Sequence, residues 1–278
     1  GSWFDPVFYT ESGQWYGRRK RRETVPGEKH TGYCSDVYTD QALAWLKARD
    51  AKKPFCMMLH FKAPHHSYEY PERWKDYLKD TLIPEPPSLH EDVEKTSPRL
   101  KGVHTWHMIK KNGYFGRHEM DQSPPMWPHD GTARGKTSAA YQHMIHKYLR
   151  AVGAVDENIK RVMDFLEQDN IKDETVVIYT SDQGYWLGQH GLYDKRLILE
   201  GSIKMPFIVR YPREIKAGTV SDALCSNVDF APTLLGIAGI PVPKTMQGAV
   251  SYTHLRAHET LRESGSRGGR EKKKGGGG

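Results

Sequence analysis

Short apolar runs alternate with longer stretches of helical periodicity along this chain. The candidate strands are the apolar runs at residues 54–61, 176–180 and 205–212. Between the first two, within residues 138–170, apolar side chains recur every three to four positions, which predicts a long amphipathic helix. We also expect a helix over residues 35–50 and another that ends near Gly239. Strands that alternate with helices are typical of an α/β fold, with a mostly parallel central sheet and helices on both faces.

The 278 residues, 37% of them hydrophobic, suit one large α/β domain, and residues 80–135 resemble a long insertion rich in proline, histidine and charge. No apolar run reaches the roughly 18 residues that a membrane helix needs. Cys34, Cys56 and Cys225 have unrelated spacings, which excludes a zinc framework or a disulfide scaffold. Cys56 lies in an apolar run, so we expect it to be a buried thiol.

The formal net charge of +7 is concentrated at the end of the chain. Residues 249–278 lack periodicity, and their four arginines, three lysines and three glutamates leave a net charge of only +3 for residues 1–248. This weakens the case for nucleic-acid binding. The stretch VSYTHLRAHET resembles a translated sequencing adapter, so we expect 249–278 to be a non-native tail. The alternative is a genuine disordered basic tail.

Polar side chains follow two of the candidate strands. Asp182 and Gln183 come after the run at 176–180, and His65 follows the run at 54–61, at the strand ends where such sheets bind ligands. A carboxylate and an amide oxygen suit Ca²⁺ or Mg²⁺, although Asp182 is equally suited to begin a turn. His65 is a candidate proton donor, and Lys195 a candidate ligand for an oxyanion. Either of these two residues alone is more often a solvated loop residue.

The stretch TSDQGYWLGQHGLYDKRLILEGSIKMPFIVRYP resembles the sulfatase family of the alkaline-phosphatase superfamily. The resemblance continues through HTGYCSDVYTDQALAWL, HFKAPH, YLRAVGAVDENIKRVMDFLE and DFAPTLLGIAGIPVPKTMQG, and spans most of residues 30–248. Within the family, the chain most resembles enzymes that act on sulfated sugars. The resemblance implies a partial alkaline-phosphatase-like fold over residues 1–248, and hydrolysis of sulfate esters.

The resemblance also implies roles for individual residues. Asp182 and Gln183 would be two ligands of one Ca²⁺, with Gln in place of the commoner Asn. Lys195, from the Asp-Lys-Arg triplet, would bind a sulfate oxygen. His65, from the Ala-Pro-His motif, would contact the sulfate and its bridging oxygen and help to protonate the leaving alcohol.

The chain departs from the family pattern at several points. Gln189 and Gly201 stand where the family often has glutamates, which we expect to alter only loop packing, and His190 is expected near the site without a role. The family's nucleophile is a formylglycine made within a Cys/Ser-x-Pro/Ala-x-Arg motif, and the sequence contains no such motif. We therefore expect a fragment truncated at both ends, with the formylglycine in a missing N-terminal segment and no sulfatase activity on its own.

Two other functions compete with a Ca²⁺-dependent sulfatase of sulfated carbohydrates. A phosphatase or phosphodiesterase of the same superfamily would usually hold two transition metals, with an Asp-His pair in place of Asp182-Gln183. A non-catalytic module would bind anionic glycans through the five cations at residues 18–22, which otherwise form a solvated loop. For the preferred sulfatase we expect no nucleic-acid or membrane partner, and the family suggests a periplasmic or secreted location.

Overall fold

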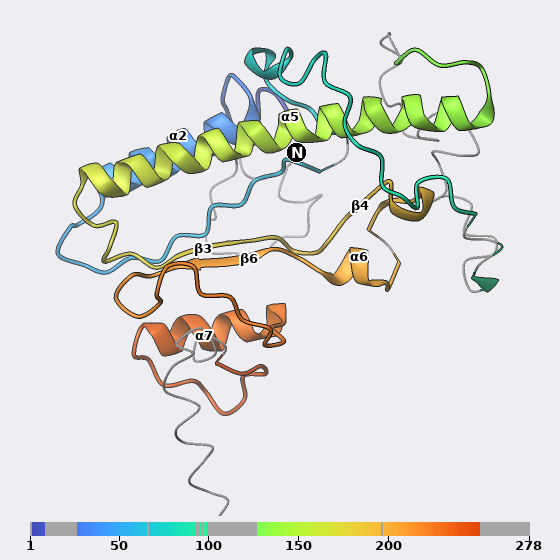
Figure 1. Cartoon of the computed structure of the whole chain (residues 1–278). Helices are drawn as coiled ribbons and strands as arrows, with labels where there is room; N and C mark the ends of the chain where they lie inside the picture. Colours follow the sequence, from blue (N-terminus) through green and yellow to red (C-terminus); the bar gives the residue numbers. More distant parts are fainter. Residues whose placement is uncertain are drawn as a thin grey trace, which may run out of the picture. The chain divides into compact units, whose positions relative to one another are not determined.

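The computed structural model describes residues 2–8, 27–65, 67–92, 95, 97–98, 127–195 and 197–250 (Figure 1). The chain consists of two compact units: the first contains Gly1–Asp169 and Gln183–Lys204, and the second contains Asn170–Asp182 and Met205–Gly278. The basic run at 18–22, residues 99–126 of the predicted insertion and residues 251–278 of the predicted tail lie outside the described residues. Within the described part, no helix combines the length and apolar character needed to cross a bilayer.

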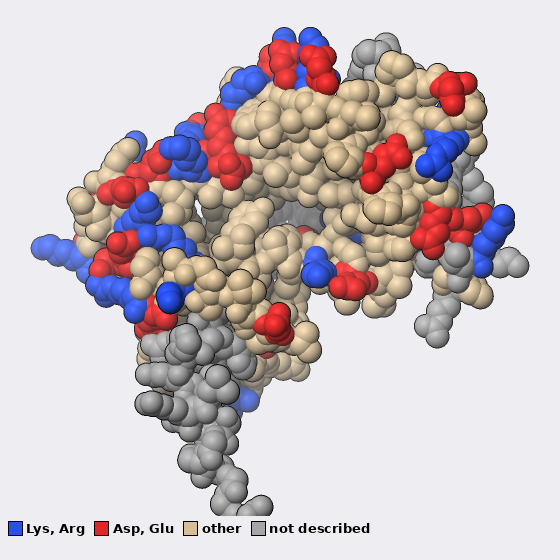
Figure 2. Space-filling model, viewed as in Figure 1, with Lys and Arg blue, Asp and Glu red and all other residues tan. Residues whose placement is uncertain are grey.

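Charged side chains of both signs lie intermixed on the face of the described residues that Figure 2 shows. Among the described residues, several charged side chains form ion pairs within one helix or its end, such as Lys160 with Asp164 and Lys204 with Glu200. This face therefore carries no large area of a single sign of charge, in keeping with the ordinary net charge of residues 1–248.

Two helices, α2 (Cys34–Ala48) and α5 (Ala133–Gln168), form the frame of the first unit (Figure 1). Both were predicted from their periodicity and are confirmed. The long helix begins before the predicted Ser138, because Thr132 caps it by accepting a hydrogen bond from the Gly135 amide at 3.0 Å. Ala151 and Ala154 of α5 are fully buried in one cluster with Cys34 of α2, and these small side chains let the two helices approach closely.

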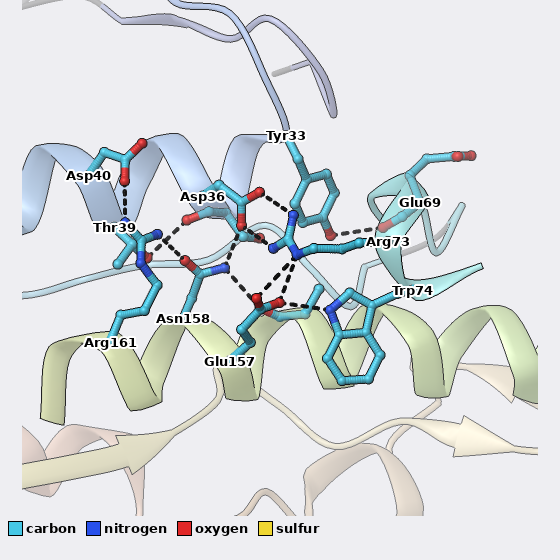
Figure 3. Close-up of polar contacts among 12 residues, drawn as sticks. Tyr33, Asp36, Thr39, Asp40, Glu69, Arg73, Trp74, Glu157, Asn158 and Arg161 are labelled. Carbon is cyan, nitrogen blue, oxygen red and sulfur yellow. Dashed lines mark hydrogen bonds and ion pairs between the residues drawn. The ribbon is translucent and has the colours of Figure 1, made fainter. Parts of the chain in front are cut away.

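A network of charged and amide side chains ties the two helices to the short helix η1 (Glu72–Trp74), as Figure 3 shows. The Arg73 guanidinium donates to both carboxylate oxygens of Asp36 on α2, at 2.7 and 2.8 Å, and to Glu157 on α5 at 2.9 Å. Asn158 donates to Asp36 at 2.7 Å, and the Trp74 indole donates to Glu157 at 2.8 Å. The segment just after His65 is thereby fixed to both helices.

The core around the N-terminal half of α5 gathers side chains from distant parts of the first unit. Its buried members are Tyr68, Leu89, Ala140, Tyr141, Met144, Ile145 and Tyr193. Tyr68 follows the turn that carries His65, and Tyr193 belongs to the strand that precedes Lys195. This core therefore supports both segments that carry predicted site residues of the first unit.

In the second unit, β3 (Val177–Thr180) pairs with β6 (Phe207–Arg210), and Val177 lies opposite Arg210. The Arg210 guanidinium donates to the carbonyl of Lys172, which joins β6 to the turn before β3. The short helix η4 (Asn227–Asp229) leads into α7 (Phe230–Ile237), where Phe230 stacks on Phe207 with ring centroids 5.3 Å apart. These elements confirm the predicted strands at 176–180 and 205–212 and the helix near Gly239.

The predicted parallel sheet is not present among the described residues. All of the ladders found there are antiparallel and two-stranded: β1 (Val7–Phe8) with β2 (Glu28–Lys29), β3 with β6, and β4 (Trp186–Leu187) with β5 (Tyr193–Asp194). The strand predicted at residues 54–61 is wrong, since no described strand pairs with this run. Met58 is 74% exposed, and Cys56, predicted to be buried, is exposed as well. A strand is buried on both faces only where neighbouring strands pair with it and other layers cover it.

Candidate active site

Strand β3 ends at Thr180, and Asp182 and Gln183 follow it after a single serine. Asp182 is exposed and Gln183 is half-buried. The structure thus places both oxygen donors directly beyond a strand end, where the sequence predicted them; their role as metal ligands stays a prediction. The boundary between the two units falls between these residues, so Asp182 belongs to the second unit, whereas Gln183, Lys195 and His65 belong to the first.

Gly184 fixes the backbone immediately after Gln183. Its amide donates to the carbonyl of Ser202, at 2.8 Å, in the short helix α6 (Glu200–Ile203). A Cβ atom at Gly184 would lie 2.3 Å from the carbonyl oxygen of Gly201 and 2.5 Å from that of Lys204, so only glycine fits between these backbone segments. The position of Gln183 is therefore set by backbone contacts of its neighbour.

The loop that carries Lys195 is a hairpin of strands β4 and β5. Trp186 pairs with Asp194, and Leu187 pairs with Tyr193. The turn between the strands, which includes η3 (Gln189–Gly191), contains Gly188 with a φ of 96°, and a Cβ there would approach the Tyr141 ring to 2.8 Å. The antiparallel register brings Lys195 back to the level of Tyr185, two residues beyond Gln183. The open end of the hairpin therefore carries both Lys195 and Gln183, the predicted metal ligand.

His65 lies in a pair of consecutive turns and is exposed. Its amide donates to the carbonyl of Lys62 at 3.0 Å, and its own carbonyl accepts from the amide of Tyr68 at 2.9 Å. The peptide bond between Ala63 and Pro64 is cis. The Lys62 ammonium lies over the ring of Trp3, 4.1 Å from its centroid, so this lysine is engaged beside the site.

Two tyrosines that the sequence analysis missed connect these segments. The hydroxyl of Tyr68, from the His65 turn, shares a hydrogen bond with the hydroxyl of Tyr185, from the start of the hairpin. Their rings meet edge to face, with centroids 6.1 Å apart. The stretch HHSYEYP contains two tyrosines, and nothing in its spacing distinguishes the one that reaches the hairpin.

The sequence profile of the Sulfatase family matches residues 4–240. The chain belongs to the sulfatase family. The N-acetylglucosamine-6-O-sulfatase of Bacteroides thetaiotaomicron is 36% identical to this chain over 90% of the chain and 48% of the relative. The extracellular sulfatase SULF-1 homolog of Drosophila melanogaster is 39% identical over 78% of the chain and 17% of its own length. This sulfatase chain thus spans about half the length of the first of these relatives and less of the second.

Solved structures confirm the fold class. One solved structure shows a protein in complex with its substrate, D-glucosamine-2-N,6-O-disulfate. It aligns with this chain at a TM-score of 0.78 and 34% identity, over 92% of this chain and 56% of the solved chain. The phosphonate monoester hydrolase of Agrobacterium radiobacter aligns with a TM-score of 0.61 at 21% identity, covering 81% and 42% of the two chains. The second likeness concerns the fold alone. The chain therefore has part of the α/β, alkaline-phosphatase-like fold.

Two departures of this chain from the family pattern have a structural explanation. The side-chain oxygen of Gln189 accepts a hydrogen bond from the Leu187 amide at 2.7 Å and so stabilises the hairpin turn. Gly201 lies against the Trp186 indole, and a Cβ atom there would be 2.6 Å from that ring. Gln189 and Gly201 thus both take part in the packing of the hairpin and of α6 against it.

His190, which had no role from sequence, joins the hairpin turn to the segment before α5. Its amide donates to the Ser88 hydroxyl at 2.9 Å, and its Nδ1 lies 2.6 Å from a carboxylate oxygen of Glu91. It adopts a left-handed backbone conformation, with a φ of 57°. The imidazole ring also meets the Trp186 ring edge to face, with ring centroids 5.7 Å apart. The surroundings of His190 therefore explain it as a residue that shapes the turn.

The two side chains that follow β3 offer oxygen atoms of the kind that a hard cation such as Ca²⁺ binds. Asp182 and Gln183 offer carboxylate and amide oxygens, which Ca²⁺ prefers. Ca²⁺ takes about six to eight oxygen ligands. Among the described residues, no group of three or more His, Cys, Asp or Glu side chains is arranged to hold a metal ion. The assignment of Asp182 and Gln183 as ligands of one Ca²⁺ stays a prediction.

Proposed function

We propose that the protein containing this chain is a sulfuric ester hydrolase that acts on sulfated carbohydrates. The observation that carries the proposal is the 36% identity, over 90% of the chain, with a relative named N-acetylglucosamine-6-O-sulfatase. The hairpin register supports it, because it returns Lys195 of the Asp-Lys-Arg triplet to the end of the loop where Gln183 lies.

Each candidate residue has a distinct task in this reaction. Asp182 and Gln183 would contribute oxygens to one Ca²⁺, an ion that when bound supplies positive charge to the sulfate group. Lys195 would hold a sulfate oxygen with its ammonium group as negative charge develops there. His65 would give a proton to the alcohol oxygen as its bond to sulfur breaks. The attacking oxygen would belong to a formylglycine encoded outside the printed sequence.

The substrate that we propose is a sulfated amino sugar. The sulfatase relative is named for N-acetylglucosamine 6-O-sulfate, and the solved neighbour was described with a glucosamine disulfate. We further propose a periplasmic or secreted location, since one relative is named an extracellular sulfatase. The proposal includes no nucleic-acid or membrane partner, because residues 1–248 have an ordinary net charge.

The test is sulfate release by the protein that contains this chain together with a formylglycine segment. N-acetylglucosamine 6-sulfate and an aryl sulfate are compared with the matching aryl phosphate. We expect Lys195→Ala to lower kcat/KM about 100-fold or more, as the loss of a group that stabilises developing charge does. His65→Ala should lower it most for the sugar sulfate, whose alcohol is the poorer leaving group.

Lys204→Ala is the matched control, because Lys204 is an exposed lysine of the first unit whose ammonium pairs with Glu200. It should keep activity within about twofold of the wild type. Faster phosphate than sulfate release would instead favour the phosphatase alternative. Full activity of Lys195→Ala would overturn the assigned role of that lysine. Residues 1–248 alone, which contain no formylglycine motif, should release no sulfate.

A further inference from the structure

Tyr68 is a fully buried side chain whose only polar atom lies between two segments of the proposed site. It is 0% exposed, and its hydroxyl shares a hydrogen bond with that of Tyr185. Tyr148 of α5 backs the pair, meeting the Tyr68 ring edge to face at 5.9 Å and stacking with the Tyr185 ring at 6.3 Å. The hydrogen bond between the two hydroxyls is thus partly buried among three aromatic rings.

The hydroxyl pair adjoins the strand that leads to Lys195. Tyr68 lies in one buried cluster with Tyr193 of β5, and Tyr185 packs against that cluster. Burial is the main cause that raises the pKa of Tyr68 well above its ordinary value, so this phenol keeps its proton at neutral pH. Because β5 ends at Asp194, directly before Lys195, the pair lies beside the strand that positions this lysine.

The backbone connects each tyrosine to a candidate catalytic residue. The Tyr68 amide donates to the carbonyl of His65, so a shift of Tyr68 would pass directly to that histidine. Tyr185 precedes Trp186, whose pairing with Asp194 brings Lys195 back to the level of Tyr185. The two tyrosines are 117 residues apart in sequence, and their contact thus joins two distant segments of the first unit.

We propose that the hydroxyl pair of Tyr68 and Tyr185 is a positioning element for sulfate ester hydrolysis. It holds the His65 turn and the Lys195 hairpin in one fixed relation, so that the proton donor and the oxyanion ligand reach the same ester group. This inference rests on the proposed function. Displacement of a catalytic group by about 1 Å can cost about 100-fold in rate, so a bond that fixes two such segments has a large effect without touching the substrate.

The competing explanation is ordinary core packing, and the structure offers a matched control for it. Tyr141 lies in the same hydrophobic cluster and is 3% exposed. Its hydroxyl donates to the carbonyl of Pro84 at 2.9 Å, and Pro84 belongs to neither site segment. Tyr141→Phe therefore removes one buried hydroxyl from the same core without touching the link between the two segments.

The experiment measures kcat and KM in the whole enzyme, with its formylglycine segment, for Tyr68→Phe, Tyr185→Phe, the double variant and Tyr141→Phe. We expect kcat to fall about tenfold in each site variant with KM within about twofold, because geometry rather than binding is lost. The double variant should fall no further than the worse single variant, since both remove one bond. Tyr141→Phe should keep kcat while its Tm falls as much as in the other variants.

Unchanged kcat in Tyr68→Phe and Tyr185→Phe, or an equal loss in Tyr141→Phe, would overturn the proposal. A second measurement separates it from the proposed function. Amide hydrogen exchange in residues 62–70 and 183–195 should rise in both segments when either Tyr68 or Tyr185 loses its hydroxyl, and in neither segment for Tyr141→Phe. An inactive wild-type enzyme would reject the sulfatase proposal, and the exchange data would then decide on their own whether the pair couples the segments.

Discussion

The indole of Trp186 occupies the space that a side chain at Gly201 would need. A Cβ atom at Gly201 would lie 2.6 Å from the ring, and the indole N–H donates to the neighbouring Ser202 hydroxyl at 2.9 Å. That hydrogen bond holds the ring where it is, so the clash cannot be relieved by a small rotation. The glycine therefore allows α6 to close against the hairpin that carries Lys195.

Gly201→Ala should lower the free energy of unfolding by about 1–3 kcal/mol, the usual cost of overpacking a filled site. Chemical denaturation measures it. Trp186→Leu removes the ring, so Gly201→Ala should cost much less in that background. If Gly201→Ala lowers the free energy of unfolding equally in the wild type and in Trp186→Leu, the indole is not the reason why position 201 needs a glycine.

The network of Figure 3 makes a pH-dependent prediction. Burial alone would raise the pKa of Asp36, but the hydrogen bonds from Arg73 and Asn158 outweigh it and hold that pKa below its ordinary value. A carboxyl whose pKa is lowered by folding stabilises the native state above its unfolded pKa of about 3.9, and this contribution is lost as the pH falls through the folded pKa. Arg73 therefore contributes to stability mainly above that range.

Arg73→Ala should lower the free energy of unfolding by about 1 kcal/mol near pH 7, a modest value because the guanidinium is partly exposed. The difference from the wild type should be complete above about pH 4 and shrink as the pH falls below that value, because Asp36 of the wild type is then protonated through its lowered folded pKa. Urea unfolding across this pH range measures it. Lys75→Ala, which removes an exposed ion pair with Glu72, is the control and should show no such trend. A difference that stays constant with pH would count against the role of Asp36.

Gly153, in the middle of α5, lies against the Trp74 ring, and a Cβ atom there would be 2.3 Å from it. Alanine favours a helix by about 1 kcal/mol over glycine, but here the clash should outweigh that gain. Gly153→Ala should therefore lower Tm. At Gly135, near the start of the same helix, the nearest atom is a side-chain oxygen of Asp130, which can move away. Gly135→Ala should lower Tm less; the opposite order would refute the argument.

Local periodicity sufficed to predict the helices. The apolar spacing of α5 is a property of neighbouring residues, and it gave the helix correctly apart from its start, which depends on the cap at Thr132. The run at residues 54–61 failed for the opposite reason. Its apolar composition is the same whether or not other strands pair with it, so Cys56 and Met58 were predicted to be buried and are exposed.

In the candidate site too, local motifs could be read from the sequence, whereas contacts between distant segments could not. Asp182, Gln183, Lys195 and His65 were predicted from motifs, because the residue types and their spacing are visible in the sequence, and their roles stay predictions. The link between Tyr68 and Tyr185 was not found, because it depends on the packing of segments 117 residues apart. The fit of Gly201 under Trp186 likewise needs coordinates, since the sequence shows only that a glycine replaces a usual glutamate.

Calcium should stabilise the whole protein through Asp182. A ligand that binds only the folded state raises Tm, so chelation by EDTA should lower the Tm of the wild type. Asp182→Ala removes a charged oxygen donor and should weaken calcium binding by at least about tenfold, with a matching loss of the calcium-dependent rise in Tm. Gln183→Ala, which removes a neutral donor, should have a smaller effect.

Asp222→Ala is the control for this measurement, because Asp222 is an exposed carboxylate of the same unit. It should leave the calcium-dependent rise in Tm unchanged. The readout does not depend on turnover, so it tests the metal role apart from the sulfatase proposal. If Asp182→Ala keeps the full response to calcium, the aspartate after β3 is a turn residue, which is the alternative that the sequence left open.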